Sequence, residues 1–312
     1  MLYWLIVQNC LSNMRTVDLF CGCGGLSLGF QNAGHEIIAS FDNWDAAMDV
    51  YRLNFNHPVR KADLMDVNNV IPVIRDYAPE MIIGGPPCQD YSSAGGRNEE
   101  GGRAILTVKF ADIVTGVRPE WFVMENVSNI TKYQKVFDAI DVFHRNGYGI
   151  SYTVLNSALC GVPQKRKRFF MIGKLGAEDG FFRDYFTRNL SDKEMTMRDF
   201  FGDALGIDAY YRHPRSYARR GVFSMDEPSP TIRGVNRPMP SGYKLHTNDP
   251  VKSLDGIRPL TTLERSEVQT FPKDYHWVGS KTDIEQMIGN AVPVKLAEYV
   301  GNIIQLYIDD NV

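Results

Sequence analysis

The sequence predicts an α/β protein with a doubly wound, mostly parallel sheet and a smaller, irregular second domain. Up to residue 174, short apolar runs that stop at a glycine or an acidic residue alternate with segments of helical period. This alternation is typical of a parallel sheet with helices on both faces. From about residue 205 to 280 the chain is rich in Tyr, Arg, Pro and Gly and keeps no sustained period. That stretch indicates a second domain that depends on its loops.

Each strand is placed where a short apolar run ends abruptly, because a strand buried on both faces shows no polar alternation. The first four runs stop at Gly22, at Asp42, at the GGPP segment and at Glu125. Strands are therefore expected over 16–21, 37–41, 81–83, 121–124, 151–156 and 169–172, and helices over 26–32, 46–54, 105–114, 136–146, 283–287 and 294–308. The last helix is apolar at helical spacing, so we expect it to pack back onto the first domain.

Composition and charge favour an intracellular globular protein. The 312 residues are 44% hydrophobic and 23% charged, enough for a large core without disulfides or a metal. No apolar run is long enough to cross a bilayer. The five cysteines, without a Cys-x-x-Cys pair, favour a reducing, cytoplasmic setting. The net charge is −3, yet residues 209–246 hold seven Lys or Arg against two acids, and such a basic face can bind a phosphate backbone.

Glycines mark the turn between the first strand and the first helix, at Gly22, Gly24 and Gly25. A turn of this kind lets a ligand approach the backbone and directs helix N–H groups toward it. Asp42 ends the next strand, where a carboxylate can hold ribose hydroxyls. The third glycine of a dinucleotide fingerprint is missing, which disfavours NAD and FAD. A tight turn with a surface aspartate stays open as the alternative.

Further candidate binding residues lie beside this turn. Phe20, Asn43 and Trp44 flank the turn and the second strand end, and an aromatic face suits an adenine ring or a sulfonium cation. Core packing stays open for Phe20. Asp63, which is followed by Leu64, can hydrogen-bond an adenine amino group or cap the next helix.

The segment Gly84-Gly85-Pro86-Pro87-Cys88-Gln89 is the most informative stretch of the chain. Two prolines stiffen the backbone directly after a buried strand, and two glycines let another molecule approach. This context presents Cys88 on a loop at the ligand edge of the sheet, where a thiol can react. An inert core cysteine is the alternative, but core cysteines rarely follow such a loop.

Charged residues follow or precede two other strands. Glu125 follows the apolar run WFVM, and burial at a strand end should raise the pKa of its carboxyl, which suits a general acid. A helix N-terminal acid is the other possibility. The run QKRKR precedes the strand FFMI, and alternation sends Arg166 and Arg168 to one side and the lysines to the other. A solvated charge run is the alternative there.

Taken together, these motifs resemble those of DNA (cytosine-5)-methyltransferases of the bacterial restriction–modification type. DLFCGCGG resembles the family's cofactor loop, GGPPCQ its nucleophile loop, ENV its glutamate motif and QKRKR its arginine motif. RPLTTLERSEVQTFP and QMIGNAVP resemble its two C-terminal motifs, and all six come in the family's order. Two positions depart from the usual pattern: Cys21 replaces a small residue, and Asp42 replaces the more frequent Glu.

The resemblance implies a Rossmann-like methyltransferase sheet that binds S-adenosylmethionine, with S-adenosylhomocysteine as product. It implies a catalytic domain over 1–178 plus 283–312 and a target-recognition domain over 179–282. Double-stranded DNA is the implied substrate and a restriction endonuclease the implied system partner, with no metal, no membrane and a monomeric state. The implied catalytic residues are Cys88, Glu125, Arg166 and Arg168; the cofactor residues are Phe20, Gly22, Gly24, Gly25, Asp42, Asn43, Trp44, Asp63, Leu64, Pro87, Leu106, Asn290 and Val292. Asn43 and Trp44 compete for one position.

The same resemblance places DNA contacts in the nucleophile loop and in the variable region. Gln89 and the loop around Ser92 are expected to close over DNA, and Ser229-Pro-Thr231-Ile232 resembles the family's Thr-Ile element. Arginine can grip phosphate or read guanine in the major groove. The candidate contacts of the variable region are Arg212, Arg215, Arg219, Arg220, Thr231, Arg233 and Arg237.

Four other interpretations fit less well. A tRNA-modifying (cytosine-5)-methyltransferase shares the first motifs but is expected to carry a Cys-Phe-Thr element, and this chain has no cysteine after Cys160. An amino-methylating DNA enzyme needs Asp-Pro-Pro-Tyr or a close relative rather than a thiol. A non-catalytic DNA-binding relative should have lost part of the catalytic set. An NAD-dependent oxidoreductase leaves the GGPPCQ loop without a role.

Overall fold

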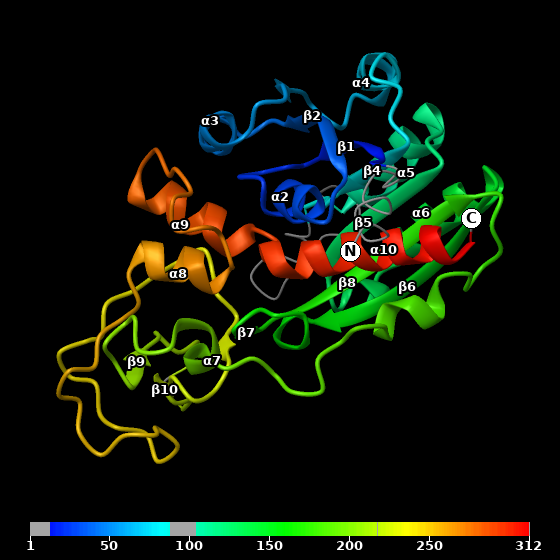
Figure 1. Ribbon diagram of the computed structural model, residues 1–312. Helices are drawn as coiled ribbons and strands as arrows, with labels where there is room; N and C mark the ends of the chain where they lie inside the picture. The colour runs from blue at the N-terminus through cyan, green and yellow to red at the C-terminus, as the bar shows by residue number, and fades with distance from the viewer. Residues whose placement is uncertain (1–12, 88–103, 217, 312) are drawn as a thin grey trace, which may run out of the picture.

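The computed structural model of the chain describes residues 13–87, 104–216 and 218–311. Its larger lobe is built on a seven-stranded sheet with the order β3-β2-β1-β4-β5-β8-β6 (Figure 1). The strands are β1 (Arg15–Leu19), β2 (Glu36–Asp42), β3 (Val59–Lys61), β4 (Met81–Gly84), β5 (Trp121–Val127), β6 (Tyr148–Asn156) and β8 (Lys167–Leu175). The first five strands pair in parallel, whereas β8 is antiparallel to both β5 and β6. The predicted, mostly parallel sheet is confirmed.

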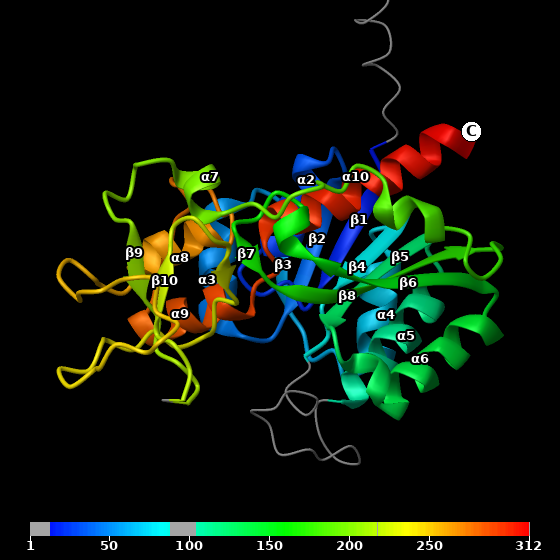
Figure 2. The ribbon, with the colours of Figure 1, turned by 90° about the horizontal axis from the view of Figure 1, so that it is seen from below.

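Helices cover both faces of this sheet, as Figures 1 and 2 show. On one face lie α4 (Val67–Arg75), α5 (Ile105–Val117) and α6 (Gln134–Arg145), which share a core with the sheet. On the other face α2 (Gly25–Asn32) packs along α10 (Val294–Asn311). The C-terminal helix therefore returns to the first lobe, as predicted from its apolar spacing.

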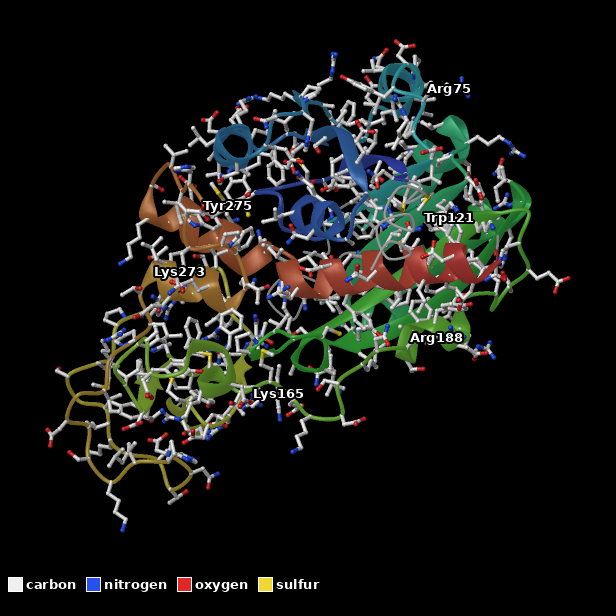
Figure 3. All side chains as sticks on the ribbon, in the orientation of Figure 1. Arg75, Trp121, Lys165, Arg188, Lys273 and Tyr275 are labelled. Carbon is white, nitrogen blue, oxygen red and sulfur yellow. The ribbon has the colours of Figure 1, made fainter. Side chains whose placement is uncertain are left out.

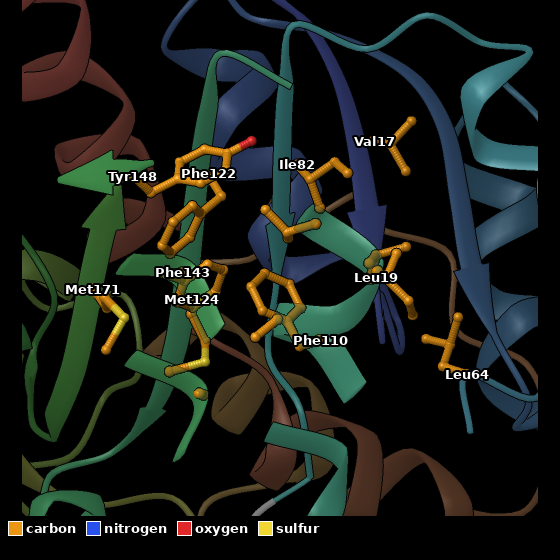
Figure 4. Packing of buried hydrophobic residues seen from close by; sticks show 14 of the residues in the cluster. Val17, Leu19, Leu64, Ile82, Phe110, Phe122, Met124, Phe143, Tyr148 and Met171 are labelled. Atoms are coloured by element: carbon orange, nitrogen blue, oxygen red, sulfur yellow. The ribbon is translucent and has the colours of Figure 1, made fainter. Parts of the chain in front are cut away.

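The two cores follow from the two-residue period of the strands. Ile82 and Phe122 belong to the core under α5 and α6, where Phe122 stacks on Phe143 with ring centroids 3.9 Å apart (Figure 4). Their strand neighbours Ile83 and Val123 belong to the core under α2 and α10. Successive side chains of a strand point to opposite faces, so the continuous apolar runs in the sequence fill both layers.

Within the seven-stranded sheet and the helices that cover it, β3 and α4 were not predicted, and β1 ends earlier than predicted. β3 is three residues long and mostly exposed, so it shows no apolar run. α4 has Pro72 in its interior, which disfavours a helix in any sequence-based assignment. β1 ends at Leu19 rather than at Cys21, because Phe20 takes a left-handed backbone conformation with φ 59°.

The smaller lobe contains short elements joined by long loops (Figures 1 and 2). β9 (Ala209–Tyr211) pairs with β10 (Val222–Ser224) antiparallel, and β11 (Ser229–Pro230) pairs in parallel with β7 (Gln164–Lys165), which directly precedes β8. Figure 3 labels Lys165 at the junction of the two lobes. The helices α7 (Met197–Phe201), α8 (Thr262–Val268) and α9 (Lys281–Asn290) follow in the second part of the chain. Elsewhere the chain forms α3 (Asp45–Asn54), between β2 and β3, and the 3-10 turns η1 (Ile130–Lys132), η2 (Ser157–Leu159) and η3 (Arg183–Thr187). No helix within the described residues is long and apolar enough to cross a membrane.

Candidate active site

Four parallel strands deliver the predicted site residues to one edge of the sheet. β1, β2, β4 and β5 are neighbours in parallel register, so their carboxyl ends meet at the same edge. The turn after β1, Asp42 at the end of β2, the Gly85–Pro87 segment after β4 and Glu125 in β5 therefore lie together. In open α/β sheets this edge is where ligands bind.

The turn after β1 is held open by Asp42. Its Oδ2 accepts the Gly22 N–H at 2.8 Å, and its Oδ1 accepts the N–H groups of Asn43 at 2.7 Å and Trp44 at 2.9 Å. These bonds fix the turn to the end of β2. Gly22 has φ +54°, and an added Cβ would meet no atom within 4 Å. The backbone of the turn therefore faces open space on the side where a ligand can approach.

The C-terminal motif QMIGNAVP packs against the same turn. A Cβ on Gly25 would lie 2.4 Å from the Val292 carbonyl oxygen, so this close approach requires glycine. Ala291 and Val292 are thereby brought beside the first residues of α2, and Asn290, which precedes them, is exposed. Gly24 caps α2 without a side-chain hydrogen bond, which leaves the positive end of the helix to a ligand or solvent.

The other cofactor candidates are placed less tightly. Trp44 packs beside the cluster that contains Tyr51, whereas Asn43 is exposed. Asp63 is exposed and accepts the Met65 N–H at 3.0 Å, and Leu64 is buried in the core under α5. Phe20 packs partly on that core, Leu106 is half-buried in the first turn of α5 and Pro87 is half-buried.

Glu125 forms a buried ion pair with Arg168. Val127 is the register partner of Arg168 on β8, so Glu125, two residues away, lies on the same face of the sheet. The Arg168 Nε is 2.9 Å from the Glu125 Oε1, and the Glu125 side chain is about 10% exposed. Burial raises the pKa of Glu125, and the guanidinium groups of Arg168 and Arg166 offset part of that rise. The predicted direction of the shift is confirmed.

The start of the nucleophile loop lies directly against Glu125. A Cβ on Gly85 would be 3.1 Å from the Glu125 Oε2, so only a residue without a side chain leaves that oxygen uncrowded. Asn126 is buried and donates from Nδ2 to the Pro86 carbonyl at 3.1 Å, which fixes the loop to β5. Cys88, Gln89 and Ser92 lie outside the described residues. Asn126 was not among the predicted site residues, although its position next to Glu125 in the motif was a usable signal.

Arg166 has a different environment from Arg168. It lies at the break between β7 and β8, is 1% exposed and donates to the Ile232 carbonyl and the Gly289 carbonyl, both at 3.0 Å. These carbonyls belong to the smaller lobe and to α9. Arg166 thus ties three distant segments together, while its charge still acts on Glu125.

The candidate DNA-contacting residues of the smaller lobe fall into three groups. Arg220 is paired with Glu227, and its guanidinium also lies 4.4 Å from the Phe223 ring centroid. Thr231 donates from Oγ1 to the Lys165 carbonyl at 2.8 Å, which attaches this segment to β7. Arg212 and Arg233 line one pocket together with Arg237, and Arg215 and Arg219 are exposed nearby in sequence.

A buried carboxyl, Asp18, lies beneath the turn. Ser27 donates to the Asp18 Oδ2 at 2.5 Å, and the Tyr51 hydroxyl donates to Ser27 at 2.7 Å. Burial, with a smaller contribution from the nearby carboxylate of Asp42, raises the pKa of Asp18 to about 8. Asp18 is therefore neutral in the folded protein under conditions in which an unfolded chain ionises it.

We expect Asp18→Asn to flatten the pH dependence of stability. The folded pKa lies above the unfolded value, so the stability that Asp18 contributes is complete below about pH 4 and is lost as pH rises toward 8. Between pH 5 and 8 the free energy of unfolding of the wild type should fall by up to about 4 kcal/mol more than that of the variant. Urea unfolding at several pH values measures this difference. Asp76→Asn, at an exposed aspartate, is the control, and parallel curves for wild type and Asp18→Asn would contradict the expectation.

Among the described residues there is no group of His, Cys, Asp or Glu that could hold a metal ion. The described part of the site contains an open glycine turn, a carboxylate that holds it, and a buried Glu–Arg pair next to the Gly85–Pro87 segment. This arrangement suits an organic cofactor and proton transfer at a bound substrate.

Comparison with known proteins agrees with this geometry. The family model for C-5 cytosine-specific DNA methylases matches residues 14–306. The chain is 55% identical over 292 residues to the type II methyltransferase M.HindV of Haemophilus influenzae, with 93% of this chain and 96% of the relative covered. It is 49% identical over 296 residues to M.HgiDI of Herpetosiphon aurantiacus, with 95% and 96% covered.

Among solved structures, the Dnmt2 methyltransferase of S. pombe superposes with a TM-score of 0.68 at 15% identity, covering 96% of this chain and 99% of the other. That likeness confirms the Rossmann-like methyltransferase fold. The strand-end geometry and the family match over residues 14–306 lead to one conclusion: the chain belongs to the family of C-5 cytosine-specific DNA methylases.

Proposed function

We propose that this protein transfers a methyl group from S-adenosylmethionine to carbon 5 of a cytosine in double-stranded DNA, as the methyltransferase of a restriction–modification system. One observation carries the proposal. The Glu125 carboxyl is buried, paired with Arg168 and in contact with the loop that leads to Cys88. A buried carboxyl with a raised pKa beside a nucleophile loop suits addition to a pyrimidine ring, which needs an acid at the ring nitrogen.

The reaction proceeds through a covalent adduct. Carbon 5 of cytosine is a weak nucleophile, but addition of the Cys88 thiolate to carbon 6 converts the ring into an enamine that can accept an alkyl group at carbon 5. Glu125 hydrogen-bonds N3 and the exocyclic amine and neutralises the charge that develops as the thiolate adds. Loss of the carbon-5 proton then expels the Cys88 thiolate and restores the ring.

Arg168 holds Glu125 in place for this step, because its Nε pairs with the Glu125 Oε1 while Oε2 lies beside Gly85, at the start of the loop that leads to Cys88. Its Nη1 donates to the Lys167 carbonyl at 2.9 Å, and the N–H groups that remain are available to the cytosine carbonyl oxygen or a phosphate. The target base has to leave the stack to reach these groups, so the enzyme flips it out of the duplex. Gln89 and Ser92 are proposed to contact DNA as the loop closes.

The residues at the turn fit S-adenosylmethionine. A carboxylate offers about four acceptor sites, and Asp42 uses three of them on backbone N–H groups, which leaves capacity for a ribose hydroxyl. The uncapped end of α2 suits the cofactor's carboxylate. When bound, S-adenosylmethionine supplies an electrophilic methyl group. Phe20, Trp44 or Asn43, Asp63, Leu64, Pro87, Leu106, Asn290 and Val292 are proposed to complete the site.

We also propose that the two lobes have different roles, one in catalysis and one in DNA recognition. Residues 1–178 and 283–312 form the catalytic domain, and residues 179–282 form the target-recognition domain. The basic excess of residues 209–246 supports this division, because affinity for DNA comes largely from neutralised phosphates. The enzyme is proposed to act as a monomer without a metal.

DNA that carries 5-fluorocytosine tests this function directly. Fluorine cannot leave carbon 5 as a proton does, so elimination stalls after methyl transfer and the protein stays bound to DNA. We expect a stable adduct on duplex DNA in the presence of S-adenosylmethionine and none with Cys88→Ala. Mapping 5-methylcytosine on ordinary plasmid DNA then identifies the target site. An adduct that forms on RNA and not on DNA would show that RNA is the substrate.

A further inference from the structure

A pocket in the smaller lobe gathers several cationic side chains. Its basic lining residues are Arg212, His213, Arg233, Arg237 and Arg265, with Asn236 beside them. Two of the guanidinium groups are held in place by backbone carbonyls: Arg212 Nη2 donates to the Thr231 carbonyl at 2.7 Å, and Arg233 Nη2 donates to the His213 carbonyl. Each arginine uses one of its five N–H groups in this way, so most donors stay available to a ligand.

No ion pair within the described residues involves Arg212, Arg233 or Arg237. Burial, followed by the positive charge of Arg233, lowers the pKa of Arg212 to about 10. The pKa of Arg233 is lowered by burial and then by its arginine neighbours Arg215 and Arg237. The pKa of His213 is lowered by burial and then by Arg237 and Arg233. The pocket thus accumulates positive charge that repels itself.

Other arginines of the same lobe are neutralised. Arg198 contacts three aspartates, Arg220 contacts Glu227, Arg258 contacts Glu264 and Arg265 contacts Glu285. Arg265 also lines the pocket and is paired there with Glu285, whereas the described residues offer no such acid to Arg212, Arg233 or Arg237. A concentration of unneutralised cations in a partly buried site is stabilised when an anion binds there.

The pocket also adjoins the segment formed by β7 and the start of β8, which carries Arg166 and Arg168. The segment that carries Arg233 begins at Thr231, whose Oγ1 donates to the Lys165 carbonyl, and Ile232, whose carbonyl accepts from Arg166. Arg168, two residues further along, pairs with Glu125. A ligand in the pocket is therefore linked through one short, hydrogen-bonded segment to the site of chemistry.

We propose that this pocket binds one backbone phosphate of the substrate DNA. The inference rests on the proposed function and adds a specific anchoring site to it. A guanine edge is the other DNA group that arginine recognises, but its O6 and N7 atoms carry no net charge and cannot offset the repulsion among three guanidinium groups. A phosphate carries the charge that the pocket lacks and accepts hydrogen bonds from more than one arginine.

Salt dependence of DNA binding tests the pocket. Arg237→Gln removes an exposed guanidinium that makes no hydrogen bond within the described residues, and Lys252→Gln removes one exposed charge from the same lobe outside the pocket. The slope of log K against log salt should fall by about one in Arg237→Gln and stay unchanged in Lys252→Gln. Affinity should fall equally for cognate and unrelated duplexes, because phosphate contacts carry no sequence information.

Arg233→Gln extends the test to an arginine held inside the pocket, with its urea midpoint measured first. Unchanged slopes in both arginine variants would overturn the proposal. So would a loss confined to cognate DNA with a new tolerance at one base pair, since that would indicate guanine readout. The 5-fluorocytosine adduct separates the two levels of inference. If the wild type forms no adduct, the proposed function is wrong. If the wild type forms the adduct but the salt slopes of both arginine variants equal that of the wild type, only the proposed phosphate pocket is wrong.

Discussion

Glu125→Gln should slow methyl transfer by about 10³-fold, within the range that a positioned general acid contributes. Glutamine has the shape of glutamate and can still accept a hydrogen bond from Arg168, so the packing against Gly85 is kept. It has no proton to give to N3 when the thiolate adds. The loss should therefore appear in the rate of chemistry under single-turnover conditions, with DNA affinity nearly unchanged.

The pH profile sharpens this expectation. Burial raises the pKa of Glu125, so the protonated form persists to higher pH than in an ordinary glutamate, and the rate should fall as pH rises through that pKa. The Gln variant cannot lose a proton there and should lack this alkaline fall. Glu120→Gln is the matched control, because Glu120 is exposed, precedes the same strand and pairs with Lys174 at 3.7 Å. A Glu125→Gln enzyme with wild-type rate would exclude the acid role.

The sequence predicts well those features that depend on neighbouring residues. Apolar runs over 81–83 and 121–124 located β4 and β5, and the glycines after β1 located a turn that the structure holds through Asp42. Once the strands are parallel, the meeting of their carboxyl ends follows from geometry alone. The buried, raised-pKa environment of Glu125 could therefore be anticipated from its place after an apolar run.

Long-range partners could not be predicted in this way. Alternation put Arg166 and Arg168 on one side, but it could not show that Arg166 donates to carbonyls 66 and 123 residues away. Likewise Asp42 was expected to hold a ribose, and its three bonds to backbone N–H groups depend on a fold around the turn that spacing does not specify. β3 and α4 were missed because a short exposed strand and a helix with an internal proline carry no periodic signal.

The placement of Arg166 leads to the second large effect: Arg166→Gln should lower the free energy of unfolding by about 3 kcal/mol. The substitution removes the donors of two buried carbonyls, Ile232 and Gly289, and each unsatisfied buried acceptor costs roughly 1–3 kcal/mol. Arg166 was assigned to the catalytic set from its motif. The contacts instead predict a positioning residue that holds the smaller lobe and α9 against β7 and β8.

Urea unfolding midpoints and methyl transfer rates together distinguish these two roles. A positioning residue should lose stability, and Arg166→Lys should rescue only part of it because an ammonium group cannot reach two carbonyls as a planar fork does. Lys167→Gln, at the exposed neighbouring position, should leave the midpoint unchanged. If Arg166→Gln kept the wild-type midpoint and lost only turnover, direct contact with substrate would be the better account. The two measurements are independent, because the carbonyls that Arg166 binds belong to the protein and not to the DNA.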